Sequence, residues 1–301
     1  MTKYSINLVI GLVFILALFS SVIMASETVK PVSVNKSEEI NKIVIKPSPV
    51  VRQGETAFFI LKSTNNLKNP YFEFKNKKVR LYSEGNGVYR GILGIDAGEK
   101  PGYNSLSFAD ESGKLDKEAG ISVVKVKFPV QNIRISGGKS TLVASQYELD
   151  KVDRAKKTIS ESSFWDNFPF ESPTKGCILS VYWLNRYHNG VPTGDYHRGV
   201  DIQAPQGQAV RSITGGKVLI AEQLRLHGGT VAIDHGQGLF SIYLHLSKTL
   251  VKEGQNISQG DIIGKVGSTG FSTGPHLHFG LYINGIPVNP SYIWVKGLNK
   301  C

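Results

Sequence analysis

The chain is poor in cysteine and has no dense basic cluster. Cys177 and Cys301 are the only two cysteines, and neither lies near the N-terminal apolar segment, which argues against a lipoprotein signal. In an exported chain such a pair predicts either a disulfide or thiols left free for other pairing. No Arg/Lys cluster with interleaved aromatic residues occurs, so the net charge of +11 gives no support to nucleic-acid binding. Repeats and low-complexity tracts are also absent.

A long apolar run stands near the start of the chain. Lys3 gives it a basic beginning, residues 8–24 are nearly all apolar, and Ala25 precedes polar sequence. This pattern is typical of a secretory signal peptide cut near Ala25, with an uncleaved membrane anchor as the alternative. We therefore expect an exported protein of the periplasm or cell envelope, whose partner by charge is the anionic envelope.

Composition and turn signals divide the rest of the chain into segments. With 41% apolar and 20% charged residues the chain is globular and long enough for two domains. Short strands parted by turn residues predict a small Ig-like β-sandwich. The predicted strands are 57–61, 71–74, 88–93 and 124–128, with a turn at 84–87. The predicted boundaries are 1–25 for the signal peptide or anchor, 26–41 for a linker, 42–128 for the sandwich, 129–174 for a connector and 175–298 for a C-terminal domain.

The connector is expected to contain a surface helix over residues 145–162. This stretch has no Pro or Gly, and Ser145 with Glu148 fits a capping box at its start. Aromatic residues within 164–169 would then form an apolar strap that leads into the C-terminal domain.

Four of the seven histidines fall in three short motifs of the C-terminal domain. Because residues i and i+2 of a strand point to the same face, His276 and His278 are expected side by side. Asp201 is predicted to lie on a short strand, with His197 in the turn before it and His245 on another strand. Two imidazoles, one carboxylate and an open position suit a catalytic zinc ion, which lowers the pKa of a bound water to about 7. A second pair of imidazoles would then move protons and stabilise an oxyanion. Each motif alone is more typical of a structural histidine, and the combination carries the prediction.

Residues 175–295 resemble the lysostaphin-like, or LytM-type, zinc metallo-endopeptidases. The resemblance rests on His197-x-Gly199-x-Asp201, Tyr243-x-His245-Leu246 and His276-Leu277-His278, and on the connecting segments 204–207, 233–239, 251–255, 260–264 and 267–275. It implies a mostly antiparallel β-sheet with a groove over the metal, one wall of which is the 267–274 loop. It further implies hydrolysis of peptide cross-links in bacterial peptidoglycan. His197, Asp201 and His278 would bind Zn²⁺, and His245 and His276 would be the general base and the transition-state stabiliser.

The sequence thus predicts a mainly β protein with an N-terminal β-sandwich, a linking helix and a C-terminal antiparallel β-sheet peptidase domain. The alternative function is a non-catalytic envelope module that binds cell wall or activates another wall hydrolase. His235 is expected to be structural, and His188 and His227 to be solvated. The N-terminal segments either restrict access to the metal or act as a spacer. The sequence assigns neither the oligomeric state nor the bond that is cut.

Overall fold

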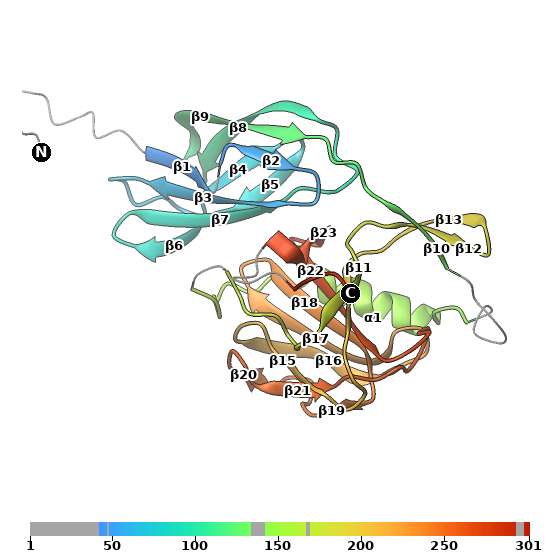
Figure 1. Cartoon of the computed structure of the whole chain (residues 1–301). Helices are drawn as coiled ribbons and strands as arrows, with labels where there is room; N and C mark the ends of the chain where they lie inside the picture. The colour runs from blue at the N-terminus through green and yellow to red at the C-terminus, as the bar shows by residue number, and fades with distance from the viewer. Residues whose placement is uncertain (1–41, 47, 134–141, 167–168, 293–297) are drawn as a thin grey trace, which may run out of the picture. The chain divides into compact units, whose positions relative to one another are not determined.

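The structure, a computed structural model, describes residues 42–46, 48–133, 142–166, 169–292 and 298–301. The expected signal peptide and linker lie outside these residues. Within them, no helix has both the length and the apolar character needed to cross a membrane. Strands dominate the described part of the chain, with α1 (Gln146–Lys157) as a prominent helix (Figure 1). The predicted mainly β class is confirmed.

The N-terminal region consists of two sheets that share one core. One sheet has the order β1 (Lys42–Lys46), β3 (Thr56–Lys62), β7 (Val88–Gly94) and β6 (Tyr82–Gly85). The other has the order β2 (Val50–Arg52), β9 (Gly113–Val124), β8 (Gly102–Asp110), β4 (Tyr71–Phe74) and β5 (Lys77–Arg80). Alternate residues of β3 are buried, as a strand with one face on a core requires. Phe59 of β3 packs on Phe72 of the second sheet, with ring centroids 4.2 Å apart.

The predicted strand over 124–128 is wrong, because β9 ends at Val124. Val124 pairs with Arg52, the last residue of β2, and the register with β8 begins at Gly102 opposite Val123. Beyond Val124 neither β2 nor β8 continues alongside the chain. The alternating apolar and basic residues 125–128 therefore have no strand with which to form backbone hydrogen bonds. The N–H of Val126 instead donates to the side-chain oxygen of Gln53 at 2.8 Å.

Helix α1 begins where the sequence predicts and ends earlier. Ser145 is the N-cap, and its hydroxyl accepts from the Glu148 N–H at 3.2 Å. The helix ends at Lys157, because Thr158 adopts an extended conformation and its N–H bonds to Ala155. The carbonyl of Ser160 then accepts from the N–H of Gln237 at 2.8 Å, so residues beyond 158 bond to another segment rather than to helix.

The C-terminal region is built on one antiparallel sheet. Its order is β11 (Cys177–Ser180), β14 (Val200–Gln203), β22 (His276–Ile283), β18 (Leu239–Leu246), β17 (Gly228–Gly236), β16 (Gly216–Leu224) and β20 (Asn256–Ile257), with β23 (Ile286–Val288) beside β22. Every pairing within it is antiparallel. Strands β17 and β18 are buried along their whole length, which agrees with their nearly continuous apolar sequence.

The two faces of this sheet have different cores. One core includes Tyr243, Phe279 and Leu281, together with the small sheet of β15 (Ala209–Arg211), β21 (Ile262–Lys265) and β19 (Lys248–Thr249). On the other face, Val152 and Ala155 of α1 pack on residues such as Ile242 and Leu244. The predicted surface helix therefore covers part of the sheet. The remaining small sheet contains β10 (Val130–Ile133), β12 (Asn185–His188) and β13 (Val191–Tyr196), and η2 (Pro290–Tyr292) follows β23.

The disulfide left open by the sequence is present. Cys177 in β11 bonds to Cys301, with a sequence separation of 124 residues. Constraining a loop of this length in the unfolded chain stabilises the fold by about 5 kcal/mol in the chain-entropy model. The N–H of Cys301 also donates to Ile178 at 3.1 Å, so the chain end is held against the strand next to β14.

Candidate active site

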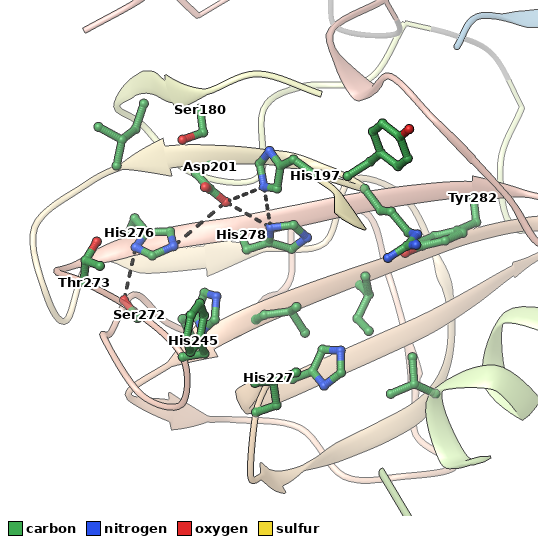
Figure 2. A pocket seen from close by; sticks show the side chains of 18 of the residues that line it. Ser180, His197, Asp201, His227, His245, Ser272, Thr273, His276, His278 and Tyr282 are labelled. Atoms are coloured by element: carbon green, nitrogen blue, oxygen red, sulfur yellow. Dashed lines mark hydrogen bonds and ion pairs between the residues drawn. The ribbon is translucent and has the colours of Figure 1, made fainter. Parts of the chain in front are cut away.

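Three neighbouring strands, with the turn before β14 that carries His197, bring the five predicted residues together. The register of β14 with β22 places Asp201 directly opposite His278, and that of β22 with β18 places His278 opposite Leu244. His276 and His278 lie on one face of β22, as the spacing predicts. His245 follows Leu244 near the end of β18. Figure 2 shows all of these side chains around one cavity.

His197, Asp201 and His278 present three ligand atoms to a common point. His197 Nε2 and His278 Nδ1 are 2.9 Å apart, and each is 2.9 Å from Asp201 Oδ1. Tetrahedral zinc with bonds of about 2.0–2.2 Å places its ligand atoms about 3.3 Å apart, close to this arrangement. Two imidazole nitrogens and one carboxylate oxygen also match the donor set of catalytic zinc. The residues present therefore fit the metal that the sequence predicts, and their role as ligands stays a prediction.

Neighbouring groups fix the orientation of these side chains. His197 Nδ1 donates to the carbonyl of Val181 at 2.9 Å, which leaves Nε2 as the nitrogen that faces the cluster. Burial raises the pKa of the Asp201 carboxyl, but the charges and hydrogen bonds of His197 and His278 outweigh it and hold that pKa well below its usual range. Asp201 is thus ionised, as a metal ligand must be.

His245 lies beside the cluster in its neutral form. Its ring centroid is 4.9 Å from that of His276 and 6.2 Å from that of His278. Burial, together with the charges of His276 and His278, lowers the pKa of His245 to about 3. Since the Thr269 carbonyl, 2.9 Å from Nδ1, can only accept, the proton of His245 is on Nδ1 and Nε2 keeps its lone pair.

The backbone of His245 is also unusual. Its φ is 62°, in the left-handed region that non-glycine residues rarely adopt, and its N–H donates to the His227 carbonyl at 3.0 Å. Such conformations cost about 1–3 kcal/mol and persist where surrounding structure enforces them, often at functional sites. His276 is held by a bond from Nδ1 to the Gly274 carbonyl at 2.8 Å, and its Nε2 lies 3.9 Å from Asp201 Oδ1.

The five residues line a groove of about 540 Å³. The predicted contribution of the 267–274 loop is confirmed, since Phe271, Ser272 and Thr273 line it. Helix α1 forms another part of the lining through Leu149, Val152 and Lys156. Among the described residues, the lining includes none from 42–133. The restriction of access by the N-terminal segments stays a prediction.

His227 is a groove residue that the sequence analysis missed, and the buried Glu148 is its partner. His227 is not merely solvated, because it lines the groove and its Nδ1 lies 2.5 Å from Glu148 Oε1. The fully buried Glu148 carboxylate also accepts from the N–H groups of Leu226 and His227. Glu148 therefore not only lies at the third position of helix α1 but also binds the segment that carries Leu226 and His227. The position of Glu148 on the buried side of an amphipathic helix was a signal available in the sequence, but its partner lies 79 residues away.

His235 has the structural role that the sequence predicts. It is fully buried, Nδ1 donates to the Gly215 carbonyl at 2.6 Å, and Nε2 lies 2.7 Å from the Ser241 hydroxyl. Burial lowers the pKa of His235 to about 4. The side chain of His188 lies outside those described.

We expect His235 to make the protein less stable in mild acid. Because its folded-state pKa is below the usual value of about 6.5, its contribution is fully present above pH 6.5 and is lost as the pH falls towards 4. The loss amounts to about 2 kcal/mol at pH 5. Urea unfolding at several pH values should therefore show a steeper decline for the wild-type chain than for His235→Gln. Parallel declines would contradict this assignment.

A model of Peptidase family M23 matches residues 195–290, a range that contains all five predicted site residues.

Residues 195–290 belong to peptidase family M23.

The M23 region is similar to curated bacterial proteins. Over 105 residues the chain is 45% identical to the DD-carboxypeptidase/endopeptidase Mpg of Neisseria meningitidis. This match covers 35% of this chain and 24% of that protein. Over 125 residues the chain is 45% identical to the peptidoglycan DD-endopeptidase ShyA of Vibrio cholerae. This match covers 42% of this chain and 29% of that protein. The chain therefore matches less than a third of the length of either relative.

The M23 region and the sheets before it are also similar to a crystal structure from Pseudomonas aeruginosa assigned to peptidase M23. The TM-score is 0.60 and the identity 27%, and the match covers 81% of this chain and 94% of that one. The resemblance to lysostaphin-like zinc peptidases is thus confirmed at the level of the family and the fold.

Proposed function

We propose that the protein is a zinc-dependent endopeptidase that hydrolyses peptide cross-links of bacterial peptidoglycan. The observation that carries this proposal is the meeting of three ligand atoms, 2.9 Å apart, beside two further imidazoles in one groove. The chain is similar to one relative named a peptidoglycan DD-endopeptidase and to another named a DD-carboxypeptidase/endopeptidase. This similarity supports peptidoglycan as the substrate class and the cell envelope as the location. It also favours a D,D-bond of the cross-link as the bond that is cut.

His197, Asp201 and His278 would hold the zinc ion. When bound, zinc lowers the pKa of a coordinated water and polarises the scissile carbonyl. His245, neutral with its proton on Nδ1, accepts a proton at Nε2 from the attacking water and returns it to the leaving amine. His276, whose ring is fixed by the Gly274 carbonyl, donates from Nε2 to the developing oxyanion when it is protonated.

The competing function is a non-catalytic module that binds the wall or activates another hydrolase. Such a module has no need for three oriented ligand atoms or for a neutral imidazole held in a strained backbone conformation. The complete set of groups therefore favours the enzyme.

Digestion of purified cross-linked muropeptides tests the proposal. The zinc-loaded chain is expected to convert muropeptide dimers to monomers, and mass spectrometry of the products identifies the bond. A chelator should stop the reaction, and His245→Ala at equal zinc content is the control for a contaminating hydrolase. Intact dimers after incubation with fully zinc-loaded protein would leave the non-catalytic module as the better account.

A further inference from the structure

The groove extends along β22 well beyond the predicted metal ligands. His276, His278, Gly280 and Tyr282 alternate along one face of this strand, and the three that carry side chains line the groove. Figure 2 shows Tyr282 on the opposite side of His278 from His276. At about 3.3 Å per residue, Tyr282 lies about 13 Å along the strand from His278.

The floor between these two residues is apolar and open. In the register of β18 with β22, Leu244 lies opposite His278 and Ile242 lies opposite Gly280. Both aliphatic side chains line the groove. Gly280 adds no side chain, and a Cβ there would approach Ile242 Cγ2 to 2.8 Å. An extended peptide thus has space to lie over this floor, with its methylene groups on Ile242 and Leu244.

Lys156 lines the groove at its Tyr282 end, and a second cationic residue, Arg198, also lines the groove. Lys156 reaches it from α1, with Nζ 5.4 Å from the centre of the Tyr282 ring, and Arg198 reaches it from the turn before β14. Nearby Asp153 is paired with Lys157 at 2.7 Å. Within the described part of the chain, Lys156 makes no ion pair with a carboxylate.

The electrostatics of Lys156 agree with a place for an added anion. Burial lowers the pKa of its ammonium group, the charge of Asp153 opposes this, and the charge of Arg198 lowers that pKa again. The ammonium group therefore lies within the field of Arg198. A carboxylate bound beside Lys156 would offset the desolvation of its ammonium group.

We infer that Lys156, next to Tyr282 in the groove, forms a carboxylate-binding subsite that selects anionic stem peptides over neutral ones such as oligoglycine. This inference rests on the proposed function. The subsite takes a free carboxylate of the stem peptide, one to three residues from the scissile bond, because about 13 Å of extended backbone and side chain separates it from His278. The apolar floor and the Tyr282 ring contact the intervening aliphatic atoms.

The first test measures cleavage by the zinc-loaded full chain. Its substrates are cross-linked muropeptide dimers with free carboxylates and the same dimers with those carboxylates converted to amides. Amidation is expected to lower kcat/KM of the wild-type chain about 10-fold to 100-fold, the usual effect of a lost charge-assisted contact. Lys156→Gln should show the lower value on both substrates, whereas Lys156→Arg should keep most of the selectivity.

Lys157→Gln is the matched control. It removes the same charge from the next residue of α1, whose side chain is exposed and does not line the groove. It should discriminate between the two substrates as the wild type does. Equal zinc content and equal unfolding midpoints for all variants separate loss of the subsite from loss of the fold. If amidation affects wild type and Lys156→Gln equally, the subsite is refuted while cleavage still supports the proposed function.

A second test is independent of cleavage. Calorimetry compares the affinity of each chain for the stem tetrapeptide with free carboxylates and for its fully amidated form. A preference for the free form that disappears in Lys156→Gln supports the subsite, even if the wild type cuts neither dimer and the proposed function fails. Equal affinity of the wild-type chain for both forms refutes the subsite.

Discussion

Replacing His278 by Ala is expected to empty the metal site. The three ligand atoms of His197, Asp201 and His278 lie 2.9 Å apart, and removal of one leaves two protein ligands. Structural zinc sites bind with about 10–16 kcal/mol through four ligands, so each ligand contributes about 2.5–4 kcal/mol, which is about 60-fold to 700-fold in affinity. Elemental analysis after dialysis should find little zinc in His278→Ala, and hydrolysis should be lost with it.

The matched control for this experiment is His227→Ala. His227 also lines the groove, but it is bonded to Glu148 and lies outside the ligand cluster, so this variant should retain zinc. Full zinc occupancy in His278→Ala would refute the ligand assignment. Loss of zinc from His227→Ala would mean that the reduced occupancy reflects general damage to the groove.

Replacing His245 or His276 by Ala is expected to separate metal binding from turnover. Neither residue belongs to the cluster of three ligand atoms, so both variants should keep zinc at the wild-type level. The turnover number should fall about 100-fold or more in each, because proton transfer or oxyanion stabilisation is lost. Zinc content and kcat measured on the same preparation provide the comparison.

The result for His276 has a further use. Its Nε2 is only 3.9 Å from Asp201 Oδ1, so it lies close to the predicted ligands. If His276→Ala loses its zinc while His278→Ala retains it, the two histidines have exchanged roles. If both His245→Ala and His276→Ala turn over at the wild-type rate, the catalytic assignment is wrong and the ligand assignment is unaffected.

The sequence determined the local features that depend on neighbouring residues. The i, i+2 spacing of His276 and His278 put both imidazoles on one face of β22, since side chains alternate along a strand. Ser145 marked the start of α1, because a hydroxyl at this position satisfies a free N–H of the first turn. The motifs around His197, His245 and His276 indicated the family, which is confirmed for residues 195–290.

Tertiary structure decided the features that join distant residues. Residues 124–128 have a strand-like pattern, but β9 ends at Val124, where its pairing with β2 also ends, and pairing partners are not encoded locally. Cys177 and Cys301 meet because the chain end lies beside β11. The assembly of α1 on the sheet buries Glu148 against His227 and brings Lys156 to Tyr282. His197 and His278 are also 81 residues apart, but their short motifs resemble those of a known family, which made their meeting predictable. No such motif marks the contact of Glu148 with His227, so that part of the groove was not predictable.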